Sequence, residues 1–258
     1  FIDTIGLEKN LLLPKFYTSL FSYLAKYSIK KADLIRSISE FTEKQVLNFG
    51  YQGLFVRFPA WINIDNYLNA DIKRSYSDTF KIIFVGSVTE RKNPKIIIES
   101  LETIDGNVSL EIIGQTPNLK YLKELNNLIS SSKHAESITM TPFIKAEELI
   151  SKYSSANLFI LPSKSEGLGR VIIEAQSTAC PVLVSSNTGM VDLIIENETG
   201  YIFENNNKND LSNKIQHIMN NYESALQTGL NSKDFVKENQ SVANFEFGYK
   251  KLIDLVST

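Results

Sequence analysis

The chain has 258 residues, of which 43% are hydrophobic and 22% are charged, and its formal net charge is −2 at pH 7. Such a composition is typical of soluble globular proteins, and the nearly balanced charge gives no basic field, so we expect no nucleic-acid partner. The single cysteine, Cys180, excludes a disulfide within the chain and is compatible with a reducing cytoplasm, where we expect the protein to act.

The first sixty residues predict part of an α/β domain. Residues 1–3 resemble the end of a strand and the sequence begins without a methionine, so we expect an N-terminal part of the protein to precede it. The apolar spacing predicts a helix over residues 11–31, a strand over 32–38, a capped helix from Ser39, and a strand over 54–59. Residues 60–78 are rich in Asn and Asp and predict an irregular linker.

A regular alternation of strands and helices follows from Phe80 onward. Strands are predicted over residues 80–85, 108–113, 138–143, 158–161, 182–185 and 201–203. Helices are predicted over residues 94–101, 119–129, 146–153, 210–219 and 245–255, with another after Gly169. This alternation is typical of βαβ units and predicts a parallel sheet, in which a ligand binds at the carboxyl ends of the strands.

The most informative stretch runs from residue 161 to residue 175. A strand is followed by a Pro-Ser loop, by Glu166, by Gly167-Leu168-Gly169, and then by a helical pattern with Glu174 two turns further along. A glycine loop before a helix points backbone N–H groups at a phosphate, and carboxylates accept hydrogen bonds from sugar hydroxyls. A helix-start acid with a solvated glutamate explains the spacing equally well, and the combination with a phosphate loop suggests a nucleotide-sugar ligand.

A second loop follows the strand at 80–85 and contains Gly86, Arg91 and Lys92. Adjacent basic residues in a loop are more often solvated surface. Their position between the end of a strand and the start of a helix favours contact with a diphosphate, whose charge they would stabilise as it leaves.

Together these stretches resemble the donor site of family 4 glycosyltransferases, which are retaining enzymes of the GT-B fold. Glu166 and Glu174 match the E-x7-E motif of that family, and Gly86 with Lys92 matches its Gly…Lys loop. Other matching segments, covering nearly the whole chain in the family's order, are 32–40, 59–65, 162–169, 174–175, 181–182 and 199–201.

The resemblance implies an α/β fold of the GT-B type. We expect residues 1–62 to be the remainder of the N-terminal, acceptor-side Rossmann-like domain with the hinge. Residues 63–240 would form a complete C-terminal Rossmann-like domain that binds the nucleotide-sugar donor. Residues 241–258 would be a C-terminal helix that crosses back toward the N-terminal domain.

The resemblance also implies an activity and its residues. The family moves a sugar from a nucleotide-sugar to a glycan or lipid-linked acceptor, commonly in surface polysaccharide or glycoconjugate synthesis, and requires no metal or other cofactor. Lys92, helped by Arg91, would bind the donor diphosphate, and Glu166 would hold hydroxyls of the donor sugar. Glu174 would hold the ribose. The loop residues whose backbone N–H groups would contact the phosphates are Gly167, Leu168 and Gly169.

Several positions depart from the family pattern. Ser87 stands where the family often has arginine, Ala179 where glycine is common, and Asp192 where a Gly-Gly-x-x-Glu stretch usually ends. The glycine-rich loop and histidine of the family's N-terminal domain have no counterpart here. His134 and His217 are the only histidines, neither lies beside a motif, and we expect both at the surface and no metal site.

Two further alternatives remain open. The chain could be a nucleotide-binding module without turnover, or another GT-B enzyme such as an epimerase or a phosphorylase, although the intact Glu166–Glu174 pair and Lys92 favour a transferase. The helix predicted over residues 11–31 combines aromatic side chains with lysines and could lie peripherally at the inner face of a membrane. Packing of its aromatic face into the protein is the favoured alternative.

Overall fold

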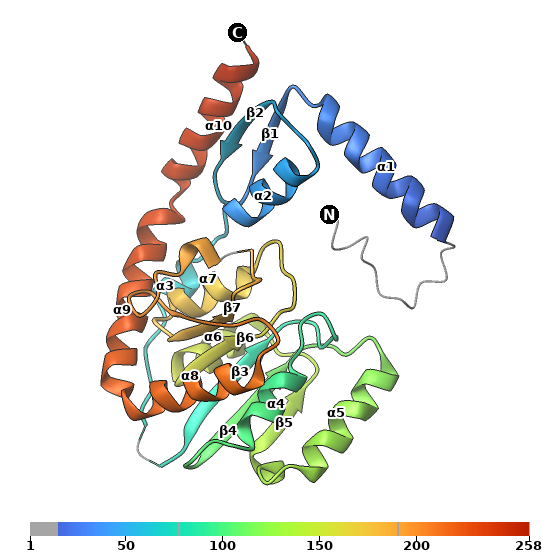
Figure 1. The fold of residues 1–258 in the computed structure, drawn as a ribbon. Helices are drawn as coiled ribbons and strands as arrows, with labels where there is room; N and C mark the ends of the chain where they lie inside the picture. The colour runs from blue at the N-terminus through green and yellow to red at the C-terminus, as the bar shows by residue number, and fades with distance from the viewer. Residues whose placement is uncertain (1–14, 77, 190, 258) are drawn as a thin grey trace. The chain divides into compact units, whose positions relative to one another are not determined.

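The computed structural model describes residues 15–76, 78–189 and 191–257, so the strand end expected at residues 1–3 lies outside the described residues. The chain divides into two compact units (Figure 1). The smaller unit comprises Phe1–Trp61 with Gln240–Thr258, and the larger unit comprises Ile62–Asn239. The α/β fold class with parallel strands is confirmed in both units.

The smaller unit combines a parallel strand pair with helices. Its elements are α1 (Lys15–Lys31), β1 (Leu34–Ser37), α2 (Glu40–Asn48), β2 (Leu54–Arg57) and α10 (Val242–Val256). The cap predicted at Ser39 is present, because the Ser39 side chain accepts a hydrogen bond from the Thr42 backbone N–H and the Thr42 hydroxyl accepts one from Ser39 N–H. This capping box fixes the start of α2 directly after β1.

An aromatic cluster joins α10 to the end of β2 within the smaller unit. The Phe58 ring lies edge-on to Phe245 and Tyr249, with centroid distances of 5.9 and 5.2 Å, and the Arg36 guanidinium lies 4.2 Å from its centroid. A Cβ on Gly248 would overlap the Phe58 ring. The helix can approach this closely because the contact position is glycine.

The aromatic face expected to pack inward on α1 is exposed in this unit. Tyr23 is 65% and Tyr27 55% exposed, and the other exposed apolar side chains of the helix are Leu20, Phe21 and Leu24. The prediction of inward packing is therefore wrong for these side chains, which are open to solvent. No helix of the described ranges is both long and apolar enough to cross a bilayer.

The larger unit is built around a parallel sheet. Its strands are β3 (Phe80–Val85), β4 (Val108–Ile113), β5 (Ile138–Thr141), β6 (Leu158–Leu161), β7 (Val182–Ser185) and β8 (Tyr201–Phe203), and they lie side by side in the order β5-β4-β3-β6-β7-β8. Every pairing is parallel. Along the sequence, β4 and β5 are added on one side of β3, and β6, β7 and β8 are then added on its other side. The strand order therefore reverses between β3 and β6.

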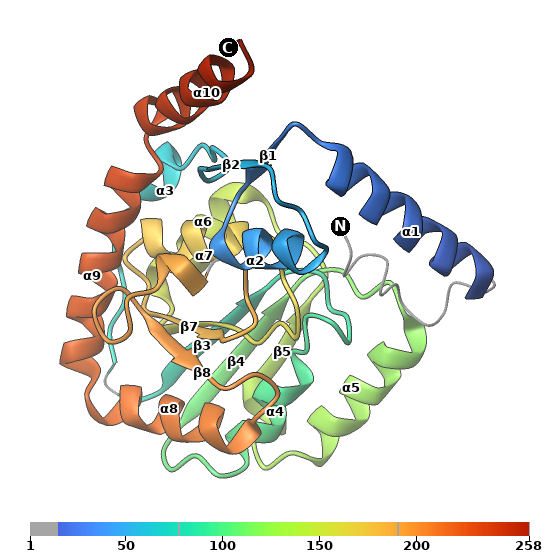
Figure 2. The same cartoon turned by 45° about the horizontal axis from the view of Figure 1, so that its top comes forward.

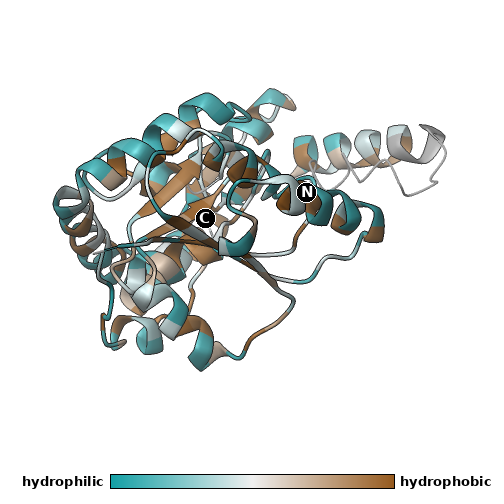
Figure 3. Ribbon diagram, turned by 90° about the horizontal axis from the view of Figure 1, so that it is seen from below, coloured by the Kyte–Doolittle hydropathy of each residue, from teal (hydrophilic) through white to brown (hydrophobic). Residues whose placement is uncertain are grey.

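Helices cover both faces of this sheet. They are α3 (Asp65–Leu68), α4 (Lys95–Leu101), α5 (Leu119–Ser131), α6 (Ala146–Ser155), α7 (Arg170–Ser177), α8 (Lys208–Asn220) and α9 (Tyr222–Asn239). Figures 1 and 2 show α4, α5 and α8 on one face and α6 and α7 on the other, and contacts between α4 and α8 and between α6 and α7 agree. Apolar strands lie between these layers (Figure 3). All residues of β6 and β7 are buried.

Most predicted elements of the larger unit are confirmed, and the differences have physical causes. The strand predicted to reach residue 143 ends at Thr141, and Phe143 is 73% exposed. The sequence did not predict α9, which packs against α7. Between Tyr222 and Val236 its buried residues are small or polar, namely Ala225, Thr228, Gly229 and Ser232. Such residues interrupt the apolar stripe from which a helix is recognised.

The segment predicted as a linker is anchored to the larger unit. It contains the short helix α3, and the Arg74 guanidinium donates hydrogen bonds to backbone carbonyls in the last turn of α6 and directly after α6 and α7. The carbonyl acceptors belong to Tyr153, Ala156, Thr178 and Ala179. Arg74 thereby satisfies the unpaired carbonyl groups at two helix ends with a single side chain.

Candidate functional site

The two loops highlighted by the sequence lie next to each other in the sheet. One follows β3 and the other follows β6, and these strands are hydrogen-bonded neighbours with Ile82 opposite Leu158. Both loops extend from the carboxyl ends of their strands, at the point where the strand order reverses. Open α/β sheets bind their ligands at this position, because the loops on either side diverge there and leave a crevice.

The loop after β3 turns through glycine. Gly86 has a φ of +145°, which other residues rarely adopt, and its N–H continues the sheet ladder by donating to the Ile113 carbonyl at 2.9 Å. A Cβ on Gly114, after β4, would overlap the Gly86 carbonyl oxygen. No side chain fits at Gly114, where the backbones of the loops after β3 and β4 meet. This close contact fixes the course of the loop that leads to Lys92.

A cluster of opposite charges joins the two loops. Lys92 Nζ forms an ion pair and hydrogen bond with Glu166 Oε2, and Arg91 lies 3.5 Å from the same oxygen. Arg91 also donates to the Ser165 carbonyl at 2.8 Å, and its own carbonyl accepts from Lys164 N–H at 2.8 Å. The structure thus brings together Arg91, Lys92 and Glu166, which the sequence singled out from positions 74 residues apart.

The Lys92–Glu166 pair is largely removed from solvent. The side chains of Lys92 and Glu166 are 12% and 10% exposed, whereas Arg91 is 46% exposed. Two charges buried this deeply each lose hydration and need the partner to compensate. Lys92 and Glu166 therefore neutralise each other's charge, and Arg91 lies on the more exposed side of the pair.

The glycine turn after Glu166 leads into α7, which begins at Arg170. Its N-cap is Gly169, and no side chain among the described residues caps the helix there, so its first backbone N–H groups have no competing side-chain acceptor. A Cβ on Gly169 would lie 2.8 Å from Ile172 Cδ1, and a Cβ on Gly167 would meet no described atom within 4 Å. A side chain at Gly169 would therefore displace the end of the Ile172 side chain, whereas Gly167 faces open space beside Leu168.

A third loop, which follows β7, contacts the loop that carries Glu166, and the sequence analysis did not predict this contact. Gly189 N–H donates to the Glu166 carbonyl at 2.6 Å, and Thr188 forms an isolated β-bridge with Glu166. A Cβ on Gly189 would lie 2.5 Å from the Gly167 carbonyl oxygen. The sequence showed this stretch only as a departure from the family pattern, although the Thr-Gly pair after a strand was a usable signal.

Buried hydrogen-bonding groups accumulate on these loops. Asn93 Nδ2, Ser163 Oγ and Thr188 Oγ1 are buried and have no hydrogen-bond partner within the described part of the chain. Asn93 also has a positive φ of 54°. Buried polar atoms are normally paired, so three unpaired ones on the loops after β3, β6 and β7 mark a region with unused hydrogen-bonding capacity.

Glu174 lies apart from the charge cluster. It is four residues after the start of α7, so it lies about one turn into the helix and not two. Its side chain is half-buried, and its Oε2 accepts a hydrogen bond from the Tyr153 hydroxyl at 3.4 Å. Burial raises the pKa of the Glu174 carboxyl, while the Arg170 charge and the Tyr153 hydrogen bond act in the opposite direction. Glu174 is therefore not a fully solvated glutamate.

The remaining polar candidates lie elsewhere. Within the described ranges, no group of three His, Cys, Asp or Glu side chains is placed to hold a metal ion. His217 is exposed, as expected, whereas His134 is half-buried and its Nε2 lies 3.1 Å from the Leu101 carbonyl oxygen. Cys180 is fully buried, and burial raises the pKa of its thiol to about 11.

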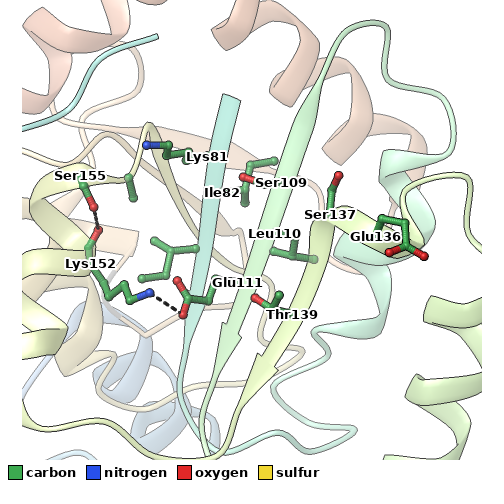
Figure 4. A pocket seen from close by; sticks show the side chains of 12 residues that line it. Lys81, Ile82, Ser109, Leu110, Glu111, Glu136, Ser137, Thr139, Lys152 and Ser155 are labelled. Atoms are coloured by element: carbon green, nitrogen blue, oxygen red, sulfur yellow. Dashed lines mark hydrogen bonds and ion pairs between the residues drawn. The ribbon is translucent and has the colours of Figure 1, made fainter. Parts of the chain in front are cut away.

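A separate hollow of about 510 Å³ opens in the larger unit (Figure 4). It is lined by residues of β3, β4, β5 and α6 and is crossed by an ion pair between Lys152 and Glu111 at 2.9 Å. Its lining includes the second residues of the strands, Lys81, Ser109 and Thr139. The hollow therefore lies toward the amino ends of the strands, away from the loops that carry the predicted site.

Known proteins with similar sequences are glycosyltransferases. The chain is 29% identical over 218 residues to an uncharacterized glycosyltransferase of Methanocaldococcus jannaschii, covering 84% of this chain and 58% of the relative. It is 28% identical over 200 residues to the capsular polysaccharide biosynthesis glycosyltransferase CapM of Staphylococcus aureus, covering 75% and 50%. The chain thus spans about half of the length of these relatives.

Solved structures confirm an α/β fold of the GT-B type. A sucrose-phosphate synthase from Thermosynechococcus elongatus superimposes with a TM-score of 0.81 at 20% identity, covering all of this chain and 66% of that structure. HepE from Anabaena, solved in complex with UDP and glucose, superimposes with a TM-score of 0.79 at 16% identity, covering 96% and 70%.

The family profile described as "Glycosyl transferases group 1" matches residues 68–235, about two thirds of the chain. The matched range contains the loops after β3, β6 and β7 and every residue singled out for the donor site. The chain belongs to the group 1 glycosyl transferases.

Proposed function

We propose that this chain contains the donor-binding part of a retaining glycosyltransferase that moves a sugar from a nucleotide-sugar to a glycan or lipid-linked acceptor. The observation that carries the proposal is the buried Lys92–Glu166 ion pair at the reversal point of the sheet, flanked by Arg91 and by the uncapped start of α7. A cation for phosphate and a carboxylate for hydroxyls lie side by side, as a nucleotide-sugar requires.

Donor binding would exchange partners within this cluster. The diphosphate takes the ammonium group of Lys92 and the guanidinium of Arg91, and the freed Glu166 carboxylate accepts hydrogen bonds from the donor sugar. Backbone N–H groups of Gly167, Leu168 and Gly169 complete the phosphate site, helped by the positive end of the α7 dipole. The exchange leaves no buried charge without a partner.

The same groups would stabilise the departing diphosphate. In a retaining transfer, the bond between the anomeric carbon and the β-phosphate oxygen breaks, and the acceptor oxygen bonds to the same face of that carbon. The acceptor proton passes to the leaving phosphate, and the carbon passes through an oxocarbenium-like state. Lys92 and Arg91 stabilise the negative charge that develops on the phosphate, so no metal ion is needed for that role.

Relatives support a role in cell-surface glycan synthesis. CapM is named for capsular polysaccharide biosynthesis, and the Escherichia coli glycosyltransferase WbnH, 27% identical over 249 residues, is named for O-antigen biosynthesis. The exposed apolar residues of α1, with Lys26, Lys30 and Lys31 on the same helix, support peripheral contact with a membrane that carries a lipid-linked acceptor.

A binding screen tests the donor site. Calorimetric titration of this chain with UDP, GDP, ADP and their sugars should give one preferred nucleotide family. Lys92→Ala should weaken binding by about 10- to 150-fold, the value of a charge-assisted hydrogen bond. Lys123→Ala, at an exposed lysine of α5, is the matched control and should bind as the wild type does.

Two outcomes would contradict the proposal. If none of these nucleotides binds, or if Lys92→Ala binds as tightly as Lys123→Ala, the donor site is not where we place it. If the full-length protein hydrolyses or epimerises its donor whatever acceptor is supplied, the transferase assignment fails even though the binding site stands.

A further inference from the structure

A fully buried tyrosine contacts the carboxylate of Glu174. Tyr153, on α6, is 0% exposed, and its hydroxyl donates to Glu174 Oε2 at 3.4 Å. Burial raises the pKa of Tyr153 well above its usual value, so the hydroxyl keeps its proton and remains a donor at any physiological pH. The direction of this hydrogen bond is therefore fixed from Tyr153 to Glu174.

The packing around Tyr153 holds its hydroxyl in place. The ring lies edge-on to Phe159 of β6, with a centroid distance of 5.7 Å, and is tilted against Tyr67 of α3 at 6.3 Å. The ring is thus enclosed by a strand of the sheet and a helix. A hydroxyl on so restricted a side chain has little freedom to turn away from its acceptor.

The charged and titratable groups that interact with Glu174 lie on α7 itself and on α6 and α3. Arg170 lies one turn earlier on α7, Tyr153 comes from α6, and Tyr67 comes from α3. Burial, and after it the charge of Glu174, raises the pKa of Tyr67 to about 12. Arg170 and Tyr153 favour the ionised carboxylate against the effect of burial. A carboxylate can accept about four hydrogen bonds, so one from Tyr153 leaves capacity for a pair of ligand hydroxyls.

We propose that Tyr153 is a positioning residue that orients the ionised Glu174 carboxylate to accept hydrogen bonds from the ribose hydroxyls of the donor nucleotide. This inference rests on the proposed donor site, since Glu174 would meet a ribose only there. Tyr153 itself touches no ligand, because its side chain is fully buried. Its effect should therefore appear in the discrimination between ribose and deoxyribose and not in diphosphate binding.

The test compares nucleotides that differ by one hydroxyl. Wild-type chain, Tyr153→Phe and Glu174→Gln are titrated with UDP and GDP and with their 2′-deoxy counterparts. The wild type should prefer the ribonucleotide by about tenfold or more, the ratio for a hydrogen bond to a charged group. Tyr153→Phe should lose most of that preference and keep its affinity for the deoxynucleotide within about twofold, as should Glu174→Gln.

A pH series adds a readout that a purely structural role would not change. The wild-type preference for ribose should fall as the pH is lowered through the raised pKa of Glu174, because the protonated carboxyl no longer attracts the hydroxyls as strongly. Removing the Tyr153 hydroxyl removes a group that lowers this pKa, so the loss should move to higher pH in Tyr153→Phe.

The matched control is Tyr222→Phe. Tyr222 is also buried and its hydroxyl accepts a hydrogen bond from Asn157 Nδ2 at 2.6 Å, away from Glu174. This variant should lose stability without any change in the ribose preference. If Tyr153→Phe does not fold, Tyr153→Met, which also lacks the hydroxyl, is used for the same comparison.

The outcomes separate this inference from the proposed function. If binding depends on Lys92 but Tyr153→Phe keeps the wild-type preference for ribose, the positioning role is overturned and the donor site stands. If no nucleotide binds to the wild type, or binding is indifferent to Lys92→Ala, the donor site itself fails. Equal loss of preference in Tyr153→Phe and Tyr222→Phe would also overturn the positioning role.

Discussion

At the scale of single residues, the buried ion pair makes Lys92 and Glu166 depend on each other. Removing one partner leaves the other charge buried with much of its compensation lost, which typically costs about 3–5 kcal/mol. We therefore expect Lys92→Met to lower the free energy of unfolding by about this amount, and the double variant Lys92→Met/Glu166→Gln to recover most of it.

Urea unfolding of the single and double variants measures this coupling. Lys73→Met is the control, because Lys73 pairs with Asp71 at the surface, where both side chains are more than two thirds exposed, and should change stability by less than about 1 kcal/mol. A double variant as unstable as Lys92→Met would show that the ion pair is not the cause.

The buried carboxyl of Glu174 predicts a conflict between stability and binding. Since burial raises its pKa in the folded protein, ionisation of Glu174 opposes folding above that pKa and has no effect below the pKa of the unfolded chain. Glu174→Gln should therefore raise the melting temperature near pH 8, and the gain should vanish near pH 4, while ribonucleotide binding weakens. A gain that persists unchanged at pH 4 would point to a cause other than ionisation.

Sequence reasoning identified part of the site residue by residue. Lys92 and Glu166 were found because each follows a strand and a turn, and parallel strands place such loops at one edge. Their roles remain predictions. Gly189 and Tyr153 were not found, since one contributes through its backbone and the other through a single hydroxyl at the end of a helix that looks ordinarily amphipathic.

At the scale of elements, two glycines in neighbouring loops should respond differently to the same change. Gly189→Ala places a Cβ against backbone carbonyls of the loop after β6, so it should cost about 1–3 kcal/mol and weaken nucleotide binding. Gly167→Ala meets no described atom within 4 Å, so stability should stay within about 0.5 kcal/mol while phosphate binding suffers. Thermal melting and nucleotide titration of both variants separate these effects, and equal destabilisation would contradict the packing argument.

Arg74 ties the segment before β3 to the ends of α6 and α7. Lysine cannot reproduce its fork of donors, and each buried carbonyl left unpaired costs about 1–3 kcal/mol. We expect Arg74→Lys to lose at least about 2 kcal/mol by denaturant unfolding. Arg57→Lys, at a half-exposed arginine with ion pairs no shorter than 3.7 Å, should change stability by less than about 1 kcal/mol. Similar losses in both variants would contradict the role given to Arg74.

The strands were the most predictable elements, because buried parallel strands are short apolar runs bounded by turn residues. The bounds of β3, β4, β6, β7 and β8 matched the prediction residue for residue. The anchoring of residues 62–76 was not predictable, since the Arg74 acceptors lie 79 to 105 residues further along the chain. The helix α9 was missed because small and polar residues interrupt its buried face between Tyr222 and Val236.

At the scale of the whole molecule, the larger unit holds every predicted donor-site residue and a hydrophobic core of its own. We expect a chain of residues 62–239 to unfold cooperatively and to bind the preferred nucleotide within about twofold of the 258-residue chain, because every proposed donor contact comes from this unit. Differential scanning calorimetry of both chains measures the cooperativity of unfolding, and calorimetric titration measures their nucleotide affinities. A folded fragment with much weaker binding would show that the smaller unit contributes to the donor site.

The reversal of strand order between β3 and β6 also has a consequence for biosynthesis. As the chain emerges from the ribosome, β3 gains its partner β4 early, but its other edge stays open until residues 158–161 have been made. That edge belongs to a strand whose last four residues are all buried in the finished fold, so it is a site of mispairing until β6 arrives. The pairing that closes this edge also brings Glu166 to Lys92, so a nascent chain assembles the proposed donor-site charges at the same step that covers the open edge of β3.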